Sequence, residues 1–232
     1  MIISLNLEKA PMKVVNNLHA FIWNSLISNN CNTYLIDGPT RILIDPGHIR
    51  LFDHVQKGFE ELGMKIEDIG LVICTHAHPD HIEAVQLFKD TQALIAFHEK
   101  EWQLIKTMDS YLNSSFGINK NSLTPDFFLK EGELFIQGLK LKIFFTPGHS
   151  PGSISIYWPE QKVLFPGDLI FKEGIGRTDL PGGDSRLLKE SIKRISELEI
   201  EELLPGHGEI IPNRDEVKAN FDFIEQFWFP QI

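Results

Sequence analysis

The segment Thr75-His76-Ala77-His78-Pro79-Asp80-His81 places three imidazoles and one carboxylate within six residues. Imidazole nitrogens and carboxylate oxygens are common protein ligands of divalent metal ions. His76 and His78 are two apart and can converge on one ion from an extended turn, whereas Asp80 and His81 begin the following helix and point elsewhere. The segment therefore predicts two adjacent metal sites, and the alternative is a polar surface loop with unrelated histidines.

Three later segments share one pattern, in which an apolar strand ends in Pro-Gly and a donor residue follows. Glycine allows the backbone to turn sharply and approach closely, so the donor leans over the sheet edge toward the metals. Each donor alone could be an ordinary turn residue, but the repetition favours three further ligands. The segments are Thr146-Pro147-Gly148-His149, Phe165-Pro166-Gly167-Asp168 and Pro205-Gly206-His207-Gly208.

With these residues the sequence resembles the metallo-β-lactamase-fold hydrolases, which carry a His-x-His-x-Asp-His loop, then a His, a bridging Asp and a final His. The resemblance implies two divalent ions, with zinc expected ahead of iron or manganese. It implies that Asp45 accepts the ring proton of a liganding imidazole, although a hairpin-end turn is the alternative. One metal would be held by His76, His78 and His149, the other by Asp80, His81 and His207, and Asp168 would bridge them.

The elements that must position these residues alternate between strands and helices. Apolar and turn patterns predict strands over 1–7, 18–27, 32–37, 41–45, 71–75, 93–97, 133–136, 139–146, 153–158, 162–166 and 202–205. Helices are predicted over 51–62, 82–90 and 99–108, after the cap Asp184 and after the cap Asn213. Two runs of strands, each followed by helices, predict an α/β fold: a four-layered αββα sandwich with two mixed β-sheets. We expect a single domain over 1–232.

Three segments or residue types have open interpretations. The polar stretch 109–126 is either a surface loop or a lid over the site. The aromatic-rich end of the chain, with Phe221, Phe223, Phe227, Trp228 and Phe229, indicates core packing or a homodimer surface. His19, His48, His54 and His98 match no ligand position and are expected to be surface or packing residues, and Cys31 and Cys74 to be reduced structural thiols.

Composition excludes several classes of partner. The net charge is −10, with 22 Lys and Arg against 32 Asp and Glu, which disfavours a nucleic-acid partner because phosphate binding needs a basic surface. No apolar run approaches the ~18 residues of a membrane span, and the first residues lack a signal-peptide pattern. We expect a cytoplasmic protein that acts on a small molecule.

The predicted metal pair indicates hydrolysis. Two cations that share a water lower its pKa, and the resulting hydroxide can attack a carbonyl without a protein nucleophile. Asp168, as the bridge, and Asp80, which could orient the hydroxide or shuttle its proton, are the expected catalytic residues.

The segment 167–184 is similar to the glyoxalase II-like branch, the hydroxyacylglutathione hydrolases, which cleave thioesters of glutathione. That similarity implies that Arg177 meets a substrate carboxylate, with Lys172 as a second cation, while an ion pair of Arg177 with Asp179 or Asp184 is the alternative. Three features depart from that branch: Asp179 replaces an aromatic, Glu209 replaces a tyrosine, and only 208–232 follow the last ligand. The expected substrate is therefore a thioester or ester.

Three other functions can be considered on the same residues, and two of them stay open. The Gly176-Arg177-Thr178-Asp179 run is also similar to persulfide dioxygenases, oxidoreductases in which one iron would be held by His76, His149 and Asp168. A lactonase or other ester hydrolase would share all seven ligands. A non-catalytic metal-folded module would be expected to have lost a ligand, and none of the seven is lost, which sets that alternative aside. The number of metals per chain separates the first of these from the hydrolases.

Overall fold

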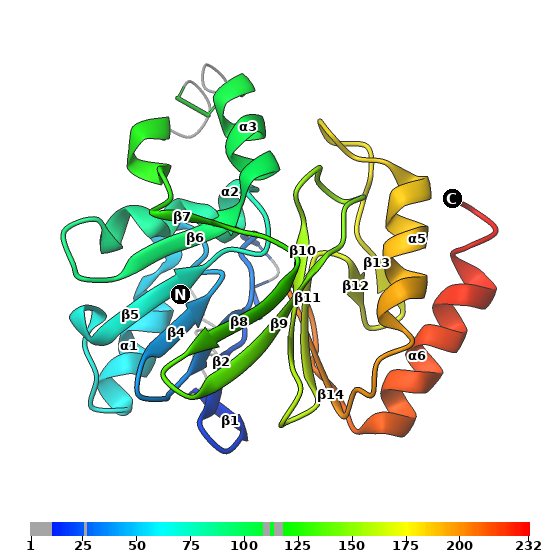
Figure 1. The fold of residues 1–232 in the computed structure, drawn as a ribbon, viewed down its shortest axis with the longest axis horizontal. Coiled ribbons are helices and arrows are strands. Elements are labelled where there is room, and N and C mark those ends of the chain that lie inside the picture. Colours follow the sequence, from blue (N-terminus) through cyan, green and yellow to red (C-terminus); the bar gives the residue numbers. More distant parts are fainter. Residues whose placement is uncertain (1–10, 26, 109–111, 114–117) are drawn as a thin grey trace, which may run out of the picture.

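Two β-sheets packed face to face, with helices on their outer sides, organise the chain (Figure 1). The computed structural model describes residues 11–25, 27–108, 112–113 and 118–232. The strand predicted over 1–7 lies outside the described residues.

The first sheet contains seven strands in chain order, antiparallel from β1 to β4 and parallel from β4 to β7. Its strands are β1 Met12–Val15, β2 Leu18–Phe21, β3 Thr33–Ile36, β4 Arg41–Ile44, β5 Ile69–Ile73, β6 Leu94–His98 and β7 Phe127–Leu129. Its helices are α1 Asp53–Glu61, α2 Pro79–Ile82 and α3 Glu99–Thr107, with 3₁₀ turns η1 Ile49–Leu51, η2 Ile66–Asp68, η3 Glu83–Phe88 and η4 Lys120–Leu123.

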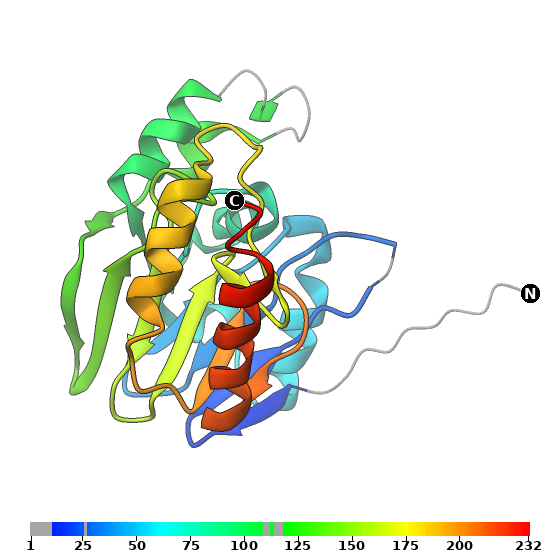
Figure 2. The ribbon, with the colours of Figure 1, turned by 90° about the vertical axis from the view of Figure 1, so that its right-hand side faces the viewer.

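The second sheet has the strand order β15-β14-β11-β10-β9-β8, and only β11 and β14 pair in parallel. Its strands are β8 Gly132–Ile136, β9 Leu139–Phe145, β10 Ile154–Trp158, β11 Val163–Gly167, β14 Glu202–Pro205 and β15 Ile211–Pro212, and a small hairpin joins β12 Ile170–Phe171 to β13 Gly174–Ile175. Helices α5 Ser185–Ile195 and α6 Arg214–Phe227 lie side by side over its outer face (Figure 2).

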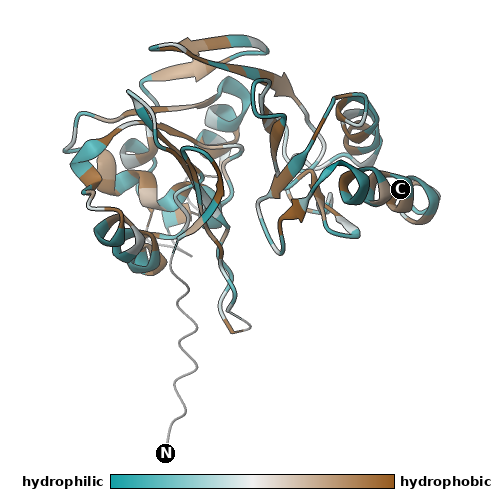
Figure 3. Ribbon diagram, turned by 90° about the horizontal axis from the view of Figure 1, so that it is seen from below, coloured by the Kyte–Doolittle hydropathy of each residue, from teal (hydrophilic) through white to brown (hydrophobic). Residues whose placement is uncertain are grey.

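Alternation of side chains along the strands builds three hydrophobic layers from two sheets. In β4, Ile42 and Ile44 face the space between the sheets, and Leu43 faces the outer helices. In β11, Phe165 faces the other sheet, whereas Leu164 packs against α5 and α6. This follows from the two-residue period of a strand. The helices carry hydrophilic as well as hydrophobic residues, as expected for outer layers (Figure 3). The predicted αββα sandwich of two mixed sheets is confirmed.

Differences from the predicted elements occur where segments are short or polar. The strand predicted over 18–27 ends at Phe21, and the backbone N–H of Trp23 donates to the Asn32 side chain (3.0 Å) instead of to a strand. The helix predicted over 82–90 is one α-helical turn, α2, continued by η3. Strands β1, β7, β12, β13 and β15 are two to four residues long, too short to show a period.

The burial of side chains bears on three features that the sequence left open: the stretch 109–126, the aromatic end of the chain and the two cysteines. In 109–126, residues 109–111 and 114–117 lie outside the described part, but Leu112, Ile118 and Leu123 are buried in the core beneath the first sheet's helices. At the chain end, the buried Phe229 packs on the second sheet's helical layer, while Phe227 is 54% exposed. Cys31 and Cys74 are buried and free.

Within the described residues, no helix has the length and apolar character needed to cross a membrane.

Candidate metal centre

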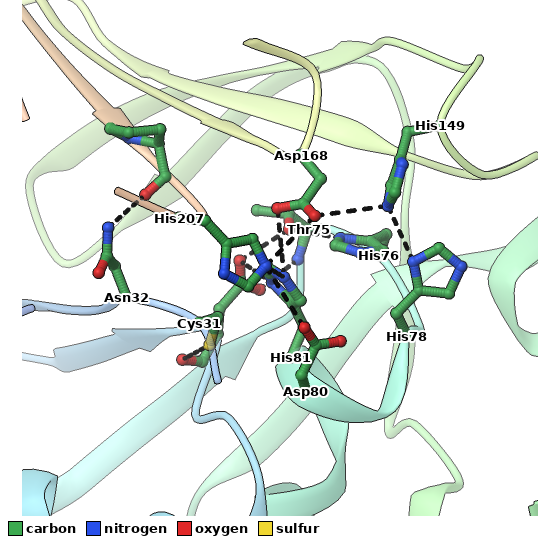
Figure 4. Close-up of polar contacts among 12 residues, drawn as sticks. Cys31, Asn32, Thr75, His76, His78, Asp80, His81, His149, Asp168 and His207 are labelled. Carbon is green, nitrogen blue, oxygen red and sulfur yellow. Dashed lines mark hydrogen bonds and ion pairs between the residues drawn. The ribbon is translucent and has the colours of Figure 1, made fainter. Parts of the chain in front are cut away.

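The predicted donor residues all follow strands whose carboxyl ends meet at one edge of the sandwich (Figure 4). β4 and β5 run parallel in the first sheet, as do β11 and β14 in the second. β9 also runs with β11, because both are antiparallel to β10. The donors thus enter one space from both sheets, and the backbone N–H of Ile154 joins the sheets there by donating to the Thr75 carbonyl (2.9 Å).

The glycines before the donors leave room for the side chains of the site. A Cβ on Gly206 would lie 2.2 Å from Oδ1 of Asp168 and 2.8 Å from Cε1 of His81. At Gly167, whose φ is +58°, a Cβ would lie 2.6 Å from Oγ1 of Thr75. These positions therefore require glycine for close approach, as the Pro-Gly pattern predicts.

One group of donors consists of His76, His78 and His149. Nδ1 of His78 lies 2.8 Å from Nε2 of His149. Nδ1 of His149 donates to the backbone carbonyl of Arg177 (2.8 Å), so in neutral His149 the lone pair is on Nε2, facing the site. Nε2 of His76 is buried and has no hydrogen-bond partner among the described residues. Such an orphaned acceptor nitrogen suits a metal ligand.

A second group consists of Asp80, His81 and His207. Nδ1 of His81 lies 3.0 Å from Oδ2 of Asp45, which leaves Nε2 of His81 facing inward, 3.2 Å from Nε2 of His207. Oδ2 of Asp80 lies 3.3 Å from Nε2 of His207 and accepts a hydrogen bond from Asn29.

Asp168 lies between the two groups. Its Oδ2 is 3.5 Å from Nε2 of His149 and 3.4 Å from Nε2 of His207, and its Oδ1 is 3.2 Å from Nε2 of His81. Carboxylates and imidazole nitrogens of both groups thus converge on a shared space, an arrangement that cations stabilise. The clusters are compatible with a binuclear metal site.

Burial and neighbouring charges divide the imidazoles into two kinds. Burial lowers the pKa of His76 and His149 and lowers that of His78 to about 4, so these rings are neutral at pH 7. Burial opposes the charged form of His207 as well, but Asp168 and Asp80 outweigh it and raise the pKa of His207 to about 9. Asp168 and Asp45 likewise hold the pKa of His81 above its usual range against burial.

Asp45 is a buried carboxylate with a complete set of donors. Its Oδ1 accepts from the backbone N–H of Thr75 (2.7 Å), and its Oδ2 accepts from the Thr75 hydroxyl (2.7 Å) and faces His81. Asp45 has φ +53°, a left-handed conformation that is uncommon outside glycine and clusters at functional sites. The geometry is that of a group that fixes the ring orientation and tautomer of His81.

Comparison with known proteins gives this donor set a family. Residues 28–207 match the Metallo-beta-lactamase superfamily. The chain belongs to that superfamily.

Two curated relatives are similar over most of this superfamily member's length. A probable metallo-hydrolase of Methanocaldococcus jannaschii is 40% identical over 77% of this chain and 88% of its own. The hydroxyacylglutathione hydrolase GloC of Haemophilus influenzae is 32% identical over 82% of this chain and 91% of its own. The chain is thus a metallo-hydrolase.

Among solved structures, TTHA1623 in a di-iron-bound form is 28% identical, with a TM-score of 0.69, and covers 88% of this chain and 98% of its own.

A pocket of about 1010 Å³ opens onto the metallo-hydrolase's donor residues. His78, Asp80, His149, Asp168 and His207 form its polar floor. Its walls are largely apolar: Phe171, Ile175, Leu180 and Pro181 come from the segment after Asp168, and Met108 from the end of α3. Because 109–111 and 114–117 lie outside the described residues, the lid interpretation of 109–126 stays a hypothesis.

The two cations predicted to meet substrate occupy different places. Arg177 lines the pocket and forms an exposed pair with Asp179, at 2.7 Å from Nε to Oδ1 and 2.6 Å from Nη2 to Oδ2. Lys172 is not among the pocket residues and pairs on the surface with Glu209. The structure therefore brings only Arg177 to the pocket.

The four histidines outside the ligand pattern pack elsewhere. His48 is buried against Glu83, His54 bonds the Leu51 carbonyl (2.7 Å), and His98 accepts from the N–H of Lys100 at the start of α3. His19 lies on β2. None of them belongs to a group of potential metal ligands in the described part of the chain.

Sequence reasoning missed Asn29, Thr75 and the carbonyl of Arg177, which contact Asp80, Asp45 and His149. Thr75 directly precedes His76 at the end of a strand, a position that could have singled it out. Asn29 and the Arg177 carbonyl carry no signal in the sequence, because only the fold brings them to their partners.

Proposed function

We propose that this metallo-hydrolase cleaves thioesters with two divalent ions, as a hydroxyacylglutathione hydrolase-like enzyme. The observation that carries the proposal is the Asp168 carboxylate, which lies within 3.5 Å of histidine nitrogens from both donor groups. A carboxylate in that position can bridge two ions.

We assign His76, His78 and His149 to one ion, Asp80, His81 and His207 to the other, and Asp168 to both. The residue types suit zinc, iron and manganese, and we propose zinc. Bound at this site, the ions would lower the pKa of a shared water and polarise a substrate carbonyl.

Side chains of the protein can orient the reacting water beside the ions. Burial would raise the pKa of Asp80, but the hydrogen bond with His207 and the nearby His81 hold it well below its usual range. Asp80 is therefore a carboxylate at pH 7, and the Asn29 amide fixes its Oδ2. In that state it can accept a hydrogen bond from the attacking water and orient it. The apolar walls exclude water from one side of the substrate.

The thioester assignment is supported by similarity to the hydroxyacylglutathione hydrolase of Haemophilus influenzae and by Arg177 at the pocket wall. A small-molecule substrate also agrees with the size of the pocket and with the net charge of −10. The pairing of Arg177 with Asp179 reduces the positive charge offered to an anionic carrier. We therefore propose cleavage of a thioester bond and assign no particular thiol to the substrate.

Elemental analysis of protein purified without chelators, combined with turnover of S-lactoylglutathione, tests the proposal. About two metals per chain and hydrolysis of the thioester are the expected results. One iron per chain with oxygen consumption on glutathione persulfide would replace the hydrolase by a dioxygenase. Two metals with turnover of lactones but not of thioesters would keep the centre and change the substrate class.

Arg177→Ala tests whether the pocket recognises an anionic thiol carrier. The variant should raise KM for glutathione thioesters several-fold more than for a neutral thioester, because a cation facing a carboxylate is lost. Lys172→Ala is the matched comparison, a cation outside the pocket, and should leave both KM values unchanged. Equal effects of Arg177→Ala on both substrates would make Arg177 a structural partner of Asp179.

A further inference from the structure

Glu101 is a buried carboxylate that the proposed reaction does not use. It lies in the first turn of α3 and is 0% exposed. No ion pair with Lys, Arg or His involves Glu101 in the described residues, so its charge is stabilised by hydrogen bonds and by the amino end of the helix. A buried carboxylate without a cation needs such donors from the surrounding backbone and side chains.

Those donors come from two loops that carry proposed metal ligands. Oε2 of Glu101 accepts from the backbone N–H of Ala77 (2.7 Å), the residue between His76 and His78. Oε1 accepts from the Ser150 hydroxyl (2.7 Å) and from the backbone N–H of Gly152 (2.6 Å), just after His149.

The second loop is shaped closely around this carboxylate. The Ser150 and Ser153 hydroxyls lie 2.6 Å apart, and Oγ of Ser153 accepts from the N–H of Ser150 (3.2 Å). A Cβ on Gly152 would lie 2.9 Å from Oε1 of Glu101 and 2.7 Å from its backbone nitrogen. In this turn the Ser150 hydroxyl and the Gly152 N–H both donate to Glu101, and the close approach of Gly152 leaves no room for a side chain there.

The group His76, His78 and His149 depends on the distance between these two loops. His76 and His78 follow β5 of the first sheet, and His149 follows β9 of the second. The 2.8 Å separation of Nδ1 of His78 from Nε2 of His149 therefore depends on how the sheets are joined at this edge. Glu101 binds the backbone on one side and both backbone and hydroxyl on the other.

We propose that Glu101 is a positioning residue that holds His76 and His78 at ligand distance from His149, and so sets the metal affinity of that group selectively. This inference rests on the proposed binuclear function. Charge-assisted hydrogen bonds from three donors in a buried setting favour a single arrangement of the loops. A glutamine would present its NH₂ to an N–H on one side, so Glu101→Gln cannot satisfy both loops.

The test is a titration of metal-free protein with Co²⁺, followed by its visible absorption and by competition with a chelator. Two reference variants define the two steps, because His78→Ala removes a donor from one group and His207→Ala from the other. In Glu101→Gln, the Co²⁺-binding step that His78→Ala affects should weaken by about 10–100-fold, as for other residues that orient ligands. The visible spectrum should change in the same direction as in the His78→Ala protein. The step lost in His207→Ala should keep its wild-type affinity.

Glu83→Gln is the matched control, because Glu83 is also buried and pairs with His48 without touching either loop. It should leave both Co²⁺ affinities unchanged. If Glu101→Gln fails to fold, Ser150→Ala decides, since it removes one donor to Glu101 and should weaken the same step by a smaller factor.

Wild-type affinity at both steps in Glu101→Gln, or equal weakening of both, would overturn the inference. If Glu101→Gln does not fold, unchanged affinities in Ser150→Ala would overturn it. A wild-type protein that binds fewer than two Co²⁺ ions would instead contradict the proposed function.

Discussion

Asp168 directly follows β11, and its carboxylate lies within 3.5 Å of histidine nitrogens from both donor groups. Its carboxylate is buried, and burial would raise its pKa, but His81 and His207 hold the pKa well below its usual range. Asp168 is therefore a carboxylate at pH 7. A buried negative charge of this kind needs positive partners. Two metal ions would provide them together with the imidazoles.

Asp168→Ala should lose both bound metals and reduce turnover by at least about 100-fold, because one ligand shared by two ions is removed. Metal content by elemental analysis and steady-state turnover measure the two effects. Glu160→Ala, an exposed carboxylate in the turn after β10, should change neither. Full activity in Asp168→Ala would contradict a two-metal mechanism.

Among the elements, α5 supports the loop that carries His149. The backbone N–H of its cap residue Asp184 donates to the carbonyl of Gly148 (2.8 Å), and the Ser191 hydroxyl donates to the carbonyl of Pro147 (2.7 Å). The Asp184 side chain caps the helix by accepting from the N–H of Leu187 (3.0 Å). Helix α5 therefore fixes a ligand loop from the outer face of the second sheet.

Asp184→Ala should lower the free energy of unfolding by about 0.5–2 kcal/mol, the usual cost of losing a helix N-cap. Urea denaturation followed by circular dichroism measures it. Glu190→Ala on the same helix removes only an exposed pair with Arg186 and should change stability by less than about 0.5 kcal/mol. Equal effects of the two substitutions would show that the cap contributes nothing.

The pair between Arg194 of α5 and Glu131, before β8, makes stability depend on acid pH. The hydrogen bond from Arg194 lowers the pKa of Glu131, so its stabilising effect is present above the unfolded value of 4.5 and is lost as the pH falls through the lower folded value. Glu131→Gln should therefore lose less stability than the wild type between about pH 5 and 3.

The expected size of that difference is about 0.2–1 kcal/mol, because the pair is partly exposed and screened by solvent. Thermal unfolding across this pH range measures it, and Glu133→Gln, which breaks a surface pair with Lys140, is the control. A wild-type acid response in Glu131→Gln would rule out this contribution.

At the scale of the whole molecule, the proposed centre joins the two halves of the sandwich. His76, His78, Asp80 and His81 belong to the first-sheet half, and His149, Asp168 and His207 follow strands of the second sheet. Bound ions would therefore link the two layers at the edge where the strands end.

Removal of the metals with a chelator should lower the melting temperature by about 5–10 °C. A ligand at 100 times its Kd stabilises a folded protein by about 2.7 kcal/mol, and 1 kcal/mol corresponds to about 2–4 °C at this size. Differential scanning calorimetry measures the shift, which should be absent in the Asp168→Ala variant. An unchanged melting temperature after verified metal loss would contradict a structural role of the centre.

The donor groups of the candidate site could largely be predicted from the sequence, because each proposed ligand follows a local signal. His149, Asp168 and His207 each follow a strand and a Pro-Gly pair, and the His76–His81 segment contains its own metal pattern. The helix caps Asp184 and Asn213 were also predictable, since a cap bonds an N–H three residues away, to Leu187 and Glu216. The period of apolar residues predicted most long elements for the same local reason.

Only the tertiary structure decided which residues far apart in the sequence meet at the site. Asn29 reaches Asp80, Glu101 reaches Ala77 and Ser150, and the carbonyl of Arg177 reaches His149, over separations of 24 to 51 residues. Arg177 lines the pocket and Lys172 does not, although both follow Asp168 closely in sequence. Ligand identity is a property of short segments, but hydrogen bonds that orient ligands depend on sheet packing, which no local pattern encodes.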